Sequence, residues 1–359
     1  MLTELNDSLP KQHGRRYYNS SEEDHRRQIF SQSVAHVLNV NSQNLSYKLE
    51  LNHLSDLTEQ EFNKQKKGYI PHPKNYTRKR RSGAEKQLQI DVTPSQEDVT
   101  PWQEDGTPWQ EDVTPWQEDV TPWQEDVTPW QEDVTPGQED VTIPTSLDWV
   151  AEGRVSSVKD QLQCGDCYAF ATTAVMEGLV AKKTGLLLNL SPQEINDCSL
   201  ESELRFFGPG LTQDCRDSSV PRQIIGPNIS YTHVNENDEA ALLQAVLRGP
   251  VFVSINANVA AFMYYTSGII NLSAQDCDPN QLDHAVTLVG YGFDDVLQLN
   301  YWKVKNSWGT SWGEDGYVRI ARGTNVCGIA ADAVEADTVE ADTVEADTVK
   351  VDIVKIGGR

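Results

Sequence analysis

A proline that recurs every seven residues between positions 91 and 140 constrains the fold of this chain more than any other feature. The segment consists of successive copies of DVTPWQE and close variants of it, in which Trp is the only regular bulky apolar residue. A heptad repeat suggests a coiled coil, but each proline would cost a helix about 3 kcal/mol and remove a backbone donor. We therefore predict that residues 71–142 form a disordered linker, a spacer rather than a Trp-mediated binding segment, with folded structure on either side.

The net charge of −24 comes mainly from two repetitive segments. Residues 91–140 contain fifteen acidic and no basic residues, and residues 332–359, which repeat VEADT three times, contain eight acidic and three basic residues. This balance excludes a basic nucleic-acid binder, and no apolar run approaches the roughly 18 residues of a membrane span. We expect neither nucleic acid nor a membrane as a partner. The alternation in the tail could suit a strand, but we predict disorder.

The cysteines mark the region in which an oxidised, folded domain is expected. All six lie between Cys164 and Cys327, a density typical of a secreted or lysosomal enzyme with its own core. Several N-x-[ST] motifs agree with a secretory route. Residues 1–17 contain no apolar signal-peptide core, so we expect a lysosomal or extracellular protein if the start of the chain is incomplete, and an intracellular one otherwise.

The hydrophobic periodicity predicts helices first and strands later. Helices are expected at residues 22–41, from residues 56–62 onward with Asp56 or Thr58 as the cap, at residues 167–184 before Gly185, and at residues 238–248. Strands are expected at Val251–Ile255, Ala285–Val289, Tyr301–Val304 and Tyr317–Ile320. This order favours an α+β fold with two subdomains over a wound parallel sheet.

A nucleophile and a base can be named from the residues alone. Cys167 lies in the first turn of a predicted helix, where free N–H groups favour a thiolate. After residue 72 the chain has two histidines; His233 lies in a polar stretch, whereas His284 opens a strand-like run. Asn306 could orient its ring and Trp308 could shield that contact from water. Cys164-x-x-Cys167 could instead be a redox or zinc motif, but no thioredoxin-like βαβ pattern and no further ligands accompany it, so we expect no metal and no cofactor.

Five sequence blocks then resemble the catalytic domain of papain-like cysteine peptidases of the cathepsin L type. They lie within residues 143–330 and occur in family order: IPTSLDWVAEGRVSSVKDQLQCGDCYAF, LSPQEINDC, LDHAVTLVGYG, YWKVKNSWGTSWGEDGYVRIARG and NVCGIA. The resemblance implies a papain-like fold of two subdomains, a helical left half and a β-barrel-like right half. It also implies roles for five residues: Cys167 as nucleophile, His284 as general base and acid, Asn306 as the group that orients it, Gln161 as oxyanion-hole donor and Trp308 as cover.

The N-terminal region resembles the helical inhibitory prosegment of the same family. Its spacing is similar to the ERFNIN pattern, with Ser33 in place of one Asn, and residues 50–56 resemble the GNFD motif. The ERFNIN positions are Glu22, Arg26, Phe30, Val37 and Asn41. The resemblance implies a monomeric zymogen that holds its own prosegment in the cleft and acts on protein or peptide substrates.

The chain also departs from the family pattern. Cys167 and His284 are 117 residues apart, whereas the family has roughly 130–150, and the GCxGG block is absent between Cys198 and Cys215. The resemblance implies disulfides Cys198–Cys215 and Cys277–Cys327, which leaves Cys164 without its usual partner and able to pair with Cys167 on oxidation. Asp166 stands where the family has a small residue, and a carboxylate there would raise the pKa of the neighbouring thiol.

We therefore predict five regions: an N-terminal extension (1–17), an inhibitor-like prosegment (18–70), the linker (71–142), a peptidase domain (143–331) and an acidic tail (332–359). The basic run at residues 78–81 is a solvated cluster, a processing site or a nuclear signal. The predicted function is a cysteine-type endopeptidase. The alternatives are a catalytically impaired homologue that inhibits or binds other peptidases, and an interaction protein that acts through its repeats.

Overall fold

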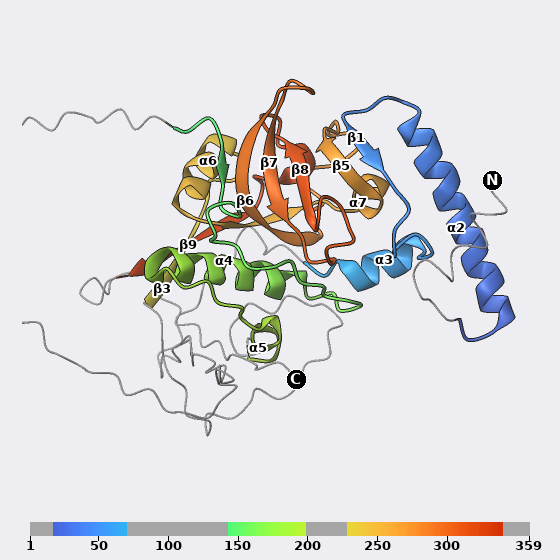
Figure 1. The fold of residues 1–359 in the computed structure, drawn as a ribbon, viewed down its shortest axis with the longest axis horizontal. Helices are drawn as coiled ribbons and strands as arrows, with labels where there is room; N and C mark the ends of the chain where they lie inside the picture. Colours follow the sequence, from blue (N-terminus) through green and yellow to red (C-terminus); the bar gives the residue numbers. More distant parts are fainter. Residues whose placement is uncertain (1–16, 70–142, 199–227, 340–359) are drawn as a thin grey trace, which may run out of the picture. The chain divides into compact units, whose positions relative to one another are not determined.

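The computed structural model describes residues 17–69, 143–198 and 228–339, shown as the coloured ribbon in Figure 1. The predictions for the linker, for the interval between Cys198 and Cys215, for the basic run and for the later tail repeats lie outside the described residues.

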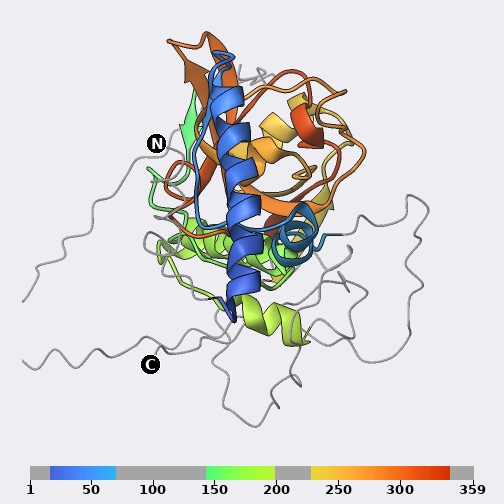
Figure 2. The same cartoon turned by 90° about the vertical axis from the view of Figure 1, so that its right-hand side faces the viewer.

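The N-terminal region folds as two helices and a short strand, α2 (Ser20–Asn41), β1 (Tyr47–Leu49) and α3 (Glu59–Lys66). Asn19 caps α2 by accepting the Glu22 N–H at 2.9 Å, and Figure 2 shows α2 as one unbroken rod. Thr58, rather than Asp56, caps α3, because Thr58 and Glu61 form a reciprocal capping box. The two helices expected in this region are therefore present.

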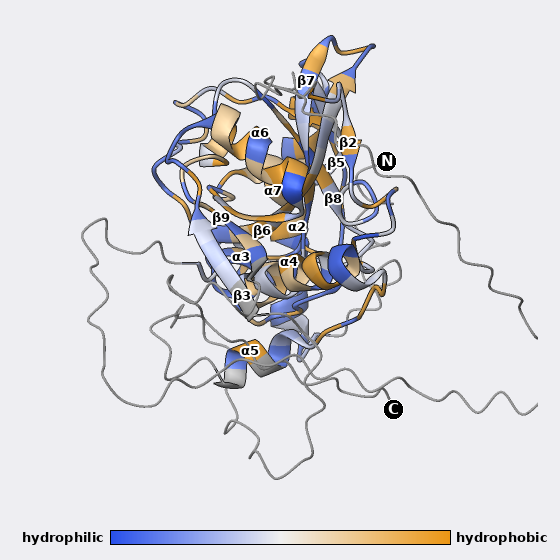
Figure 3. Cartoon of the chain, turned by 90° about the vertical axis from the view of Figure 1, so that its left-hand side faces the viewer, coloured by the Kyte–Doolittle hydropathy of each residue, from blue (hydrophilic) through white to orange (hydrophobic). Residues whose placement is uncertain are grey.

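The C-terminal region begins with helices, as the periodicity predicts. Helix α4 (Cys167–Thr184) starts after Asp166 and ends at Gly185, whose φ of +74° suits a residue without a Cβ. It packs against the sheet, chiefly along β6. The remaining helices are α5 (Pro192–Cys198), α6 (Glu239–Arg248), α7 (Ala260–Met263) and the 3₁₀ turn η2 (Val326–Gly328). Helix α6 carries both hydrophobic and hydrophilic colours in Figure 3, and its buried residues are Leu242, Ala245 and Val246.

The strands form one mainly antiparallel sheet in the order β1-β5-β8-β7-β6-β4-β9-β3, with β2 added beside β6. Only β5 and β8 pair in parallel among the described strands. The path is open, because β1 and β3 end it and no described pairing joins them, so the expected barrel-like half is an open sheet. Its strands are β1, β2 (Leu147–Asp148), β3 (Asn228–His233), β4 (Val251–Ile255), β5 (Tyr265–Ile270), β6 (His284–Asp294), β7 (Leu299–Lys305), β8 (Tyr317–Ala321) and β9 (Ala333–Val339).

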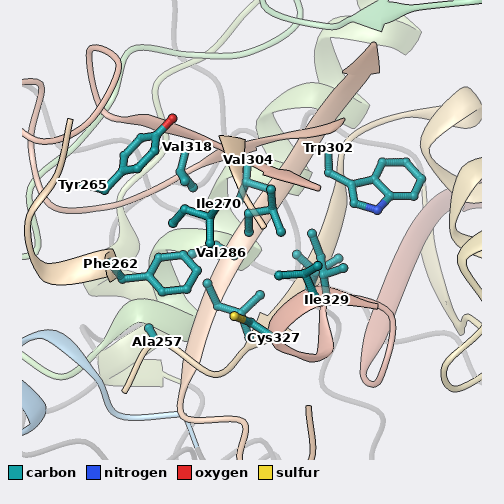
Figure 4. Close-up of a cluster of buried hydrophobic side chains, with 14 of the residues drawn as sticks. Ala257, Phe262, Tyr265, Ile270, Val286, Trp302, Val304, Val318, Cys327 and Ile329 are labelled. Carbon is teal, nitrogen blue, oxygen red and sulfur yellow. The ribbon is translucent and has the colours of Figure 1, made fainter. Parts of the chain in front are cut away.

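A cluster of fully buried apolar side chains holds the central strands in place. Figure 4 shows Val286 of β6, Trp302 and Val304 of β7, and Phe262 of α7 among its members. Burial of each such side chain stabilises a fold by about 1.5–3 kcal/mol. Since β6 begins at His284 and β7 ends one residue before Asn306, the same cluster fixes two of the predicted site residues.

The first VEADT repeat is a strand, which corrects the prediction of disorder for the start of the tail. Residues 333–339 form β9, and Val334 pairs with His233 of β3 on one side and with Phe252 of β4 on the other. A central strand forms backbone hydrogen bonds with both neighbouring strands, and the alternation places Val334 and Ala336 on the same face of the sheet. Backbone pairing on two sides therefore outweighs the acidic composition in this copy of the repeat.

The prosegment strand β1 extends the sheet at its β5 end. Tyr47 pairs with Gly268, and the Ile269 N–H donates to the Ser46 carbonyl at 2.8 Å. A Cβ on Gly268 would lie 2.4 Å from that carbonyl oxygen, so the pairing requires glycine at this position.

Candidate active site

Cys167 is the first residue of α4 and is completely buried in this structure. Its Sγ accepts a hydrogen bond from the Ala285 N–H at 3.4 Å, which places the sulfur against the start of β6. The next residue toward the N-terminus on that strand is His284. The fold thus brings the predicted nucleophile and the predicted base together although they are 117 residues apart in sequence.

His284 is held by Asn306 and Trp308. Its Nε2 lies 2.8 Å from Asn306 Oδ1, and its ring stacks on the Trp308 indole with a centroid separation of 4.8 Å. All three side chains are buried. Nδ1 of His284 has no hydrogen-bond partner in the part of the chain that the structure describes. The imidazole therefore has one nitrogen fixed by an amide, while the other makes no hydrogen bond within the described residues.

Gln161 is anchored beside this group by Ser307, a residue that the sequence analysis did not single out. The Gln161 N–H donates to the Ser307 carbonyl at 2.9 Å, and the Ser307 hydroxyl donates to Gln161 Oε1 at 2.6 Å. Gln161 Nε2 consequently donates hydrogen bonds to two other groups, the Cys164 carbonyl at 2.7 Å and the Lys66 carbonyl at 3.4 Å. The only sequence signal for Ser307 is that it directly follows Asn306.

Burial keeps both reactive groups neutral in this closed state. Loss of solvent raises the pKa of the Cys167 thiol to about 11, and the charge of Asp166 acts in the same direction. Burial likewise lowers the pKa of His284 to about 3, against the opposing effect of its bond to Asn306. A thiolate–imidazolium pair therefore needs this site to be uncovered first. Asp166 raises the pKa of the Cys167 thiol, which is the direction predicted from its position beside Cys167.

The end of the prosegment provides the cover. The Lys66 carbonyl accepts from the Trp308 indole N–H at 3.3 Å, and the Tyr69 N–H donates to the Asp283 carbonyl at 3.2 Å. Gly68 passes so close to the chain before Cys167 that a Cβ there would lie 1.8 Å from the Gly165 carbonyl oxygen. Residues 66–69 therefore lie across Cys167, the predicted nucleophile. We refer to them as the covering segment.

The prosegment helices are tied to each other and to the end of α7 by buried and part-buried polar contacts. Arg26 binds both carboxylate oxygens of Glu61 at 2.6 Å, a bidentate pair that joins α2 to α3. The Ser33 hydroxyl lies 2.8 Å from the Tyr264 hydroxyl, and Asn52 Nδ2 donates to the Met263 carbonyl at 2.9 Å. Residues of the ERFNIN-like and GNFD-like patterns thus connect the helices that precede the covering segment to the domain that it covers.

The described cysteines outside the site form one disulfide. Cys277 and Cys327 are bonded, while Cys164 and Cys167 are free thiols, Cys164 being partly exposed. The pairing of Cys198 with Cys215 concerns side chains outside the described part of the structure. Among residues 17–69, 143–198 and 228–339, no group of three potential metal-binding side chains occurs, and no helix has the length and apolarity of a membrane span.

Two family models match the chain, and together they cover both folded regions. The model described as papain family cysteine protease matches residues 143–215 and 199–336, and the model for the cathepsin propeptide inhibitor domain matches residues 10–62. The chain belongs to the papain family of cysteine proteases. As a papain-family protein with a matched propeptide domain, it has the architecture of a zymogen.

Similar proteins agree with this assignment. The chain is 37% identical to cathepsin L of Sarcophaga peregrina over 216 residues, which are 53% of this chain and 62% of the relative. It is 32% identical to fruit bromelain of Ananas comosus over 348 residues, covering 89% of this chain and 82% of the relative. This papain-family chain therefore spans less than two thirds of the cathepsin L relative but most of the bromelain.

Solved proforms have the same fold. A recombinant stem bromelain precursor matches with a TM-score of 0.67 and 28% identity, over 94% of this chain and 99% of that one. Digestive procathepsin L 3 of Tenebrio molitor matches with a TM-score of 0.63 and 26% identity, over the same shares of the two chains. The papain-like α+β fold with a helical prosegment is thus confirmed.

Proposed function

We propose that this chain is the zymogen of a cysteine endopeptidase that cuts peptide bonds through Cys167, His284 and Asn306. The observation that carries the proposal is the ordered contact series from Cys167 Sγ to Ala285, and from His284 to Asn306 at 2.8 Å under the Trp308 ring. That series supplies a nucleophile, an oriented base and a shield against water, which are the parts that acyl transfer requires.

In the proposed mechanism, release of the covering segment lets water and substrate reach Cys167. The proton of the thiol passes to His284, and the thiolate attacks the peptide carbonyl carbon. The oxyanion then accepts hydrogen bonds from the Cys167 backbone N–H and from Gln161 Nε2, which turns away from the Cys164 carbonyl. His284 gives its proton to the leaving amine, and water hydrolyses the thioester to restore the thiol.

The proposal includes the organisation of the chain around this site. Residues 18–70 act as the inhibitory prosegment, residues 71–142 as the linker and residues 143–331 as the peptidase domain, while β9 adds the start of the 332–359 tail to the fold. We propose a monomer that acts on protein or peptide substrates in a lysosomal or extracellular compartment. A Cys198–Cys215 disulfide remains part of the proposal.

Active-site labelling tests the proposed function. The full chain is freed of its prosegment by limited proteolysis at mildly acidic pH and then treated with a thiol-directed epoxide. We expect one label per molecule, at Cys167, together with hydrolysis of a protein substrate. His284→Ala should slow both reactions by at least about 10³-fold, whereas Cys164→Ser, the matched control, should leave the label in place. Labelling at Cys164 alone would contradict the proposal.

A second candidate function is an impaired homologue that inhibits other cysteine peptidases. The short interval of 117 residues between Cys167 and His284 favours it, since the absent block would form part of a substrate cleft. This candidate predicts inhibition of a cathepsin L-type enzyme by the full chain without hydrolysis of any substrate. Measuring inhibition and hydrolysis on the same preparation separates the two functions.

A further inference from the structure

Residues 156–161 and residues 305–309 lie side by side, and we call them the paired segments. A β-bridge and backbone hydrogen bonds join them, among them the bond from the Gln161 N–H to the Ser307 carbonyl at 2.9 Å. Gln161, the proposed oxyanion donor, belongs to the first segment, and Asn306, which orients the base, belongs to the second. The position of the paired segments therefore decides where two groups of the proposed mechanism lie relative to the nucleophile.

The nucleophile belongs to a different element, α4, and a buried carboxylate of that helix binds the paired segments. Glu177 is completely buried, and its two oxygens accept hydrogen bonds from Lys159 Nζ at 2.5 Å and from the Ser156 hydroxyl. Glu177 also accepts the Leu190 N–H at 2.6 Å. Both side-chain donors belong to the first of the paired segments. Glu177 therefore connects the helix that carries the nucleophile to the segment that carries the oxyanion donor.

A lysine of the second segment completes this network. Lys305 Nζ donates to the Ser156 carbonyl and to the Ser156 hydroxyl oxygen, both at 2.9 Å, and Lys305 is only 5% exposed. Burial lowers the pKa of Lys305 to about 8, and the negative charge of Glu177 opposes that change. The Ser156 hydroxyl thus accepts from Lys305 while it donates to Glu177. These side chains form one buried polar network between α4 and the paired segments.

The proposed mechanism needs two oxyanion donors from different elements to converge on one oxygen. The backbone N–H of Cys167 comes from α4, whereas Gln161 Nε2 comes from the paired segments. A misplacement of about 1 Å caused by a distant substitution can cost about 10²-fold in rate. The bond from Ser307 to Gln161 fixes the amide within the paired segments but not relative to α4. The bonds of Glu177 supply that second constraint.

We propose that Glu177 is a positioning residue for catalysis, which holds α4 against the paired segments so that both oxyanion donors reach the same oxygen. It acts through Ser156 and Lys159 and touches no reacting atom. The inference rests on the proposed peptidase function and adds to it a residue outside the site.

Glu177→Gln is the substitution that tests this role, because it keeps the shape of the side chain. One oxygen becomes an N–H₂ group that faces a donor, and the negative charge beside Lys159 is lost. Glu239→Gln is the matched control. Glu239 also accepts two hydrogen bonds, from Trp302 Nε1 at 2.8 Å and from the Gly323 N–H at 2.6 Å, but neither donor belongs to the paired segments.

The first test is hydrogen exchange of single backbone amides in the full chain, which needs no activity. Glu177→Gln should speed exchange of the Gln161 N–H about tenfold, the effect of one lost hydrogen bond to a charged group. Glu239→Gln should leave this exchange within about twofold of the parent, even where it speeds exchange of the buried Ser254 N–H in the central strand β4. Equal acceleration at Gln161 by both substitutions, or none by Glu177→Gln, overturns the proposal.

The second test compares two reactions of the activated enzyme. Alkylation of Cys167 by iodoacetamide uses the thiol and His284 but forms no oxyanion, whereas peptide hydrolysis needs both donors. Glu177→Gln should lower kcat about 10- to 100-fold, with KM within about twofold and the alkylation rate within about threefold of the parent. Glu239→Gln should change neither reaction. Equal losses in kcat and in alkylation overturn the proposal.

The two tests separate this inference from the proposed function. Hydrolysis that is unchanged by Glu177→Gln overturns the inference but not the proposed function. Absence of hydrolysis by the unmutated enzyme contradicts the proposed function, and hydrogen exchange then decides by itself whether Glu177 holds the segment of Gln161 in place.

Discussion

Replacing Arg26 should release the covering segment far more readily than replacing its neighbour Arg27. The Arg26 side chain is 15% exposed, binds Glu61 through two bonds of 2.6 Å, binds Glu22 at 2.6 Å and donates to the Asp56 carbonyl at 2.9 Å. Arg26→Ala removes the ion pair that joins α2 to the start of α3, the helix that ends in the covering segment.

The size of the effect follows from the pKa of Glu61. Chiefly through its bonds to Arg26, this pKa is lowered from the usual 4.5 to about 2. At about 1.4 kcal/mol per pH unit this corresponds to roughly 3 kcal/mol. Because the Glu61 side chain is 34% exposed, screening by water reduces the contribution to about 1–2 kcal/mol. The lost bond to the Asp56 carbonyl adds about 1 kcal/mol, so the segment should open roughly 30- to 150-fold more often.

The assay is alkylation of Cys167 in the full chain, carried out in a Cys164→Ser background so that one described free thiol remains. The reagent is kept dilute, so that the rate is proportional to the population in which the thiol is uncovered. Circular dichroism of each variant checks that the helices are retained.

Arg27→Ala is the control on the same helix. Arg27 pairs with Glu23 at 2.8 Å, but the two side chains are 33% and 39% exposed. Such an i,i+4 pair contributes about 0.3–0.5 kcal/mol, which corresponds to roughly a twofold change in rate. Equal acceleration by the two substitutions would refute the reasoning, and so would an Arg26→Ala rate within threefold of the parent.

Three further predictions concern acid, a buried carboxylate and the indole cover. Burial holds the pKa of His284 near 3 in the closed state and opening returns it toward 6.5, so this group favours opening as the pH falls; burial of Asp166, whose pKa is raised to about 6, has the opposite effect. In an Asp166→Asn background, prosegment release, followed by gel filtration, should therefore rise up to about tenfold per pH unit from pH 6 to 4, and a flat profile in that background would contradict the role of His284. Glu177 is fully buried and paired with Lys159 at 2.5 Å, so Glu177→Ala should lower the free energy of unfolding by about 3–5 kcal/mol in denaturant titrations, whereas a loss below 1 kcal/mol would argue against a structural role. Trp308→Ala should reduce kcat about 10- to 100-fold because water then reaches the His284–Asn306 bond, and Trp308→Phe should recover part of the loss; equal kcat values would show that the cover is unnecessary.

Local signals in the sequence predicted the elements that position the site. Helix α4 begins at Cys167 and ends before Gly185 as its apolar pattern and stop signal indicate, and β4 has the predicted bounds. The contacts of the covering segment were not predictable in the same way. Lys66 and Lys67 carry no apolar periodicity, and their partners Asp160 and Asp283 are more than ninety residues away in sequence, so only the assembled fold brings these charges together.

In the tail, composition predicted disorder where the structure has a strand. The composition of the VEADT repeats shows only their acidic charge. It cannot show that β3 and β4 each pair with one more strand that lies between them. Val334 and Ala336 pack partly buried against the cluster that contains Cys167, and this contact fixes the first copy of the repeat. Position in the sheet, rather than the composition of the repeat, decides the outcome.

Departure of the prosegment changes which strand lies at one end of the sheet. While β1 is paired, the backbone of β5 is occupied by the Tyr47–Gly268 register and by the bond from Ile269 to Ser46. Once β1 leaves, β5 presents these N–H and C=O groups as an open edge, and open edges are templates for pairing with other chains. Maturation therefore replaces the three-residue edge strand β1 by the six-residue strand β5, which offers more backbone groups for such pairing. An activated preparation should be more prone to aggregation with rising protein concentration than the intact precursor, even though no residue of the catalytic domain has changed.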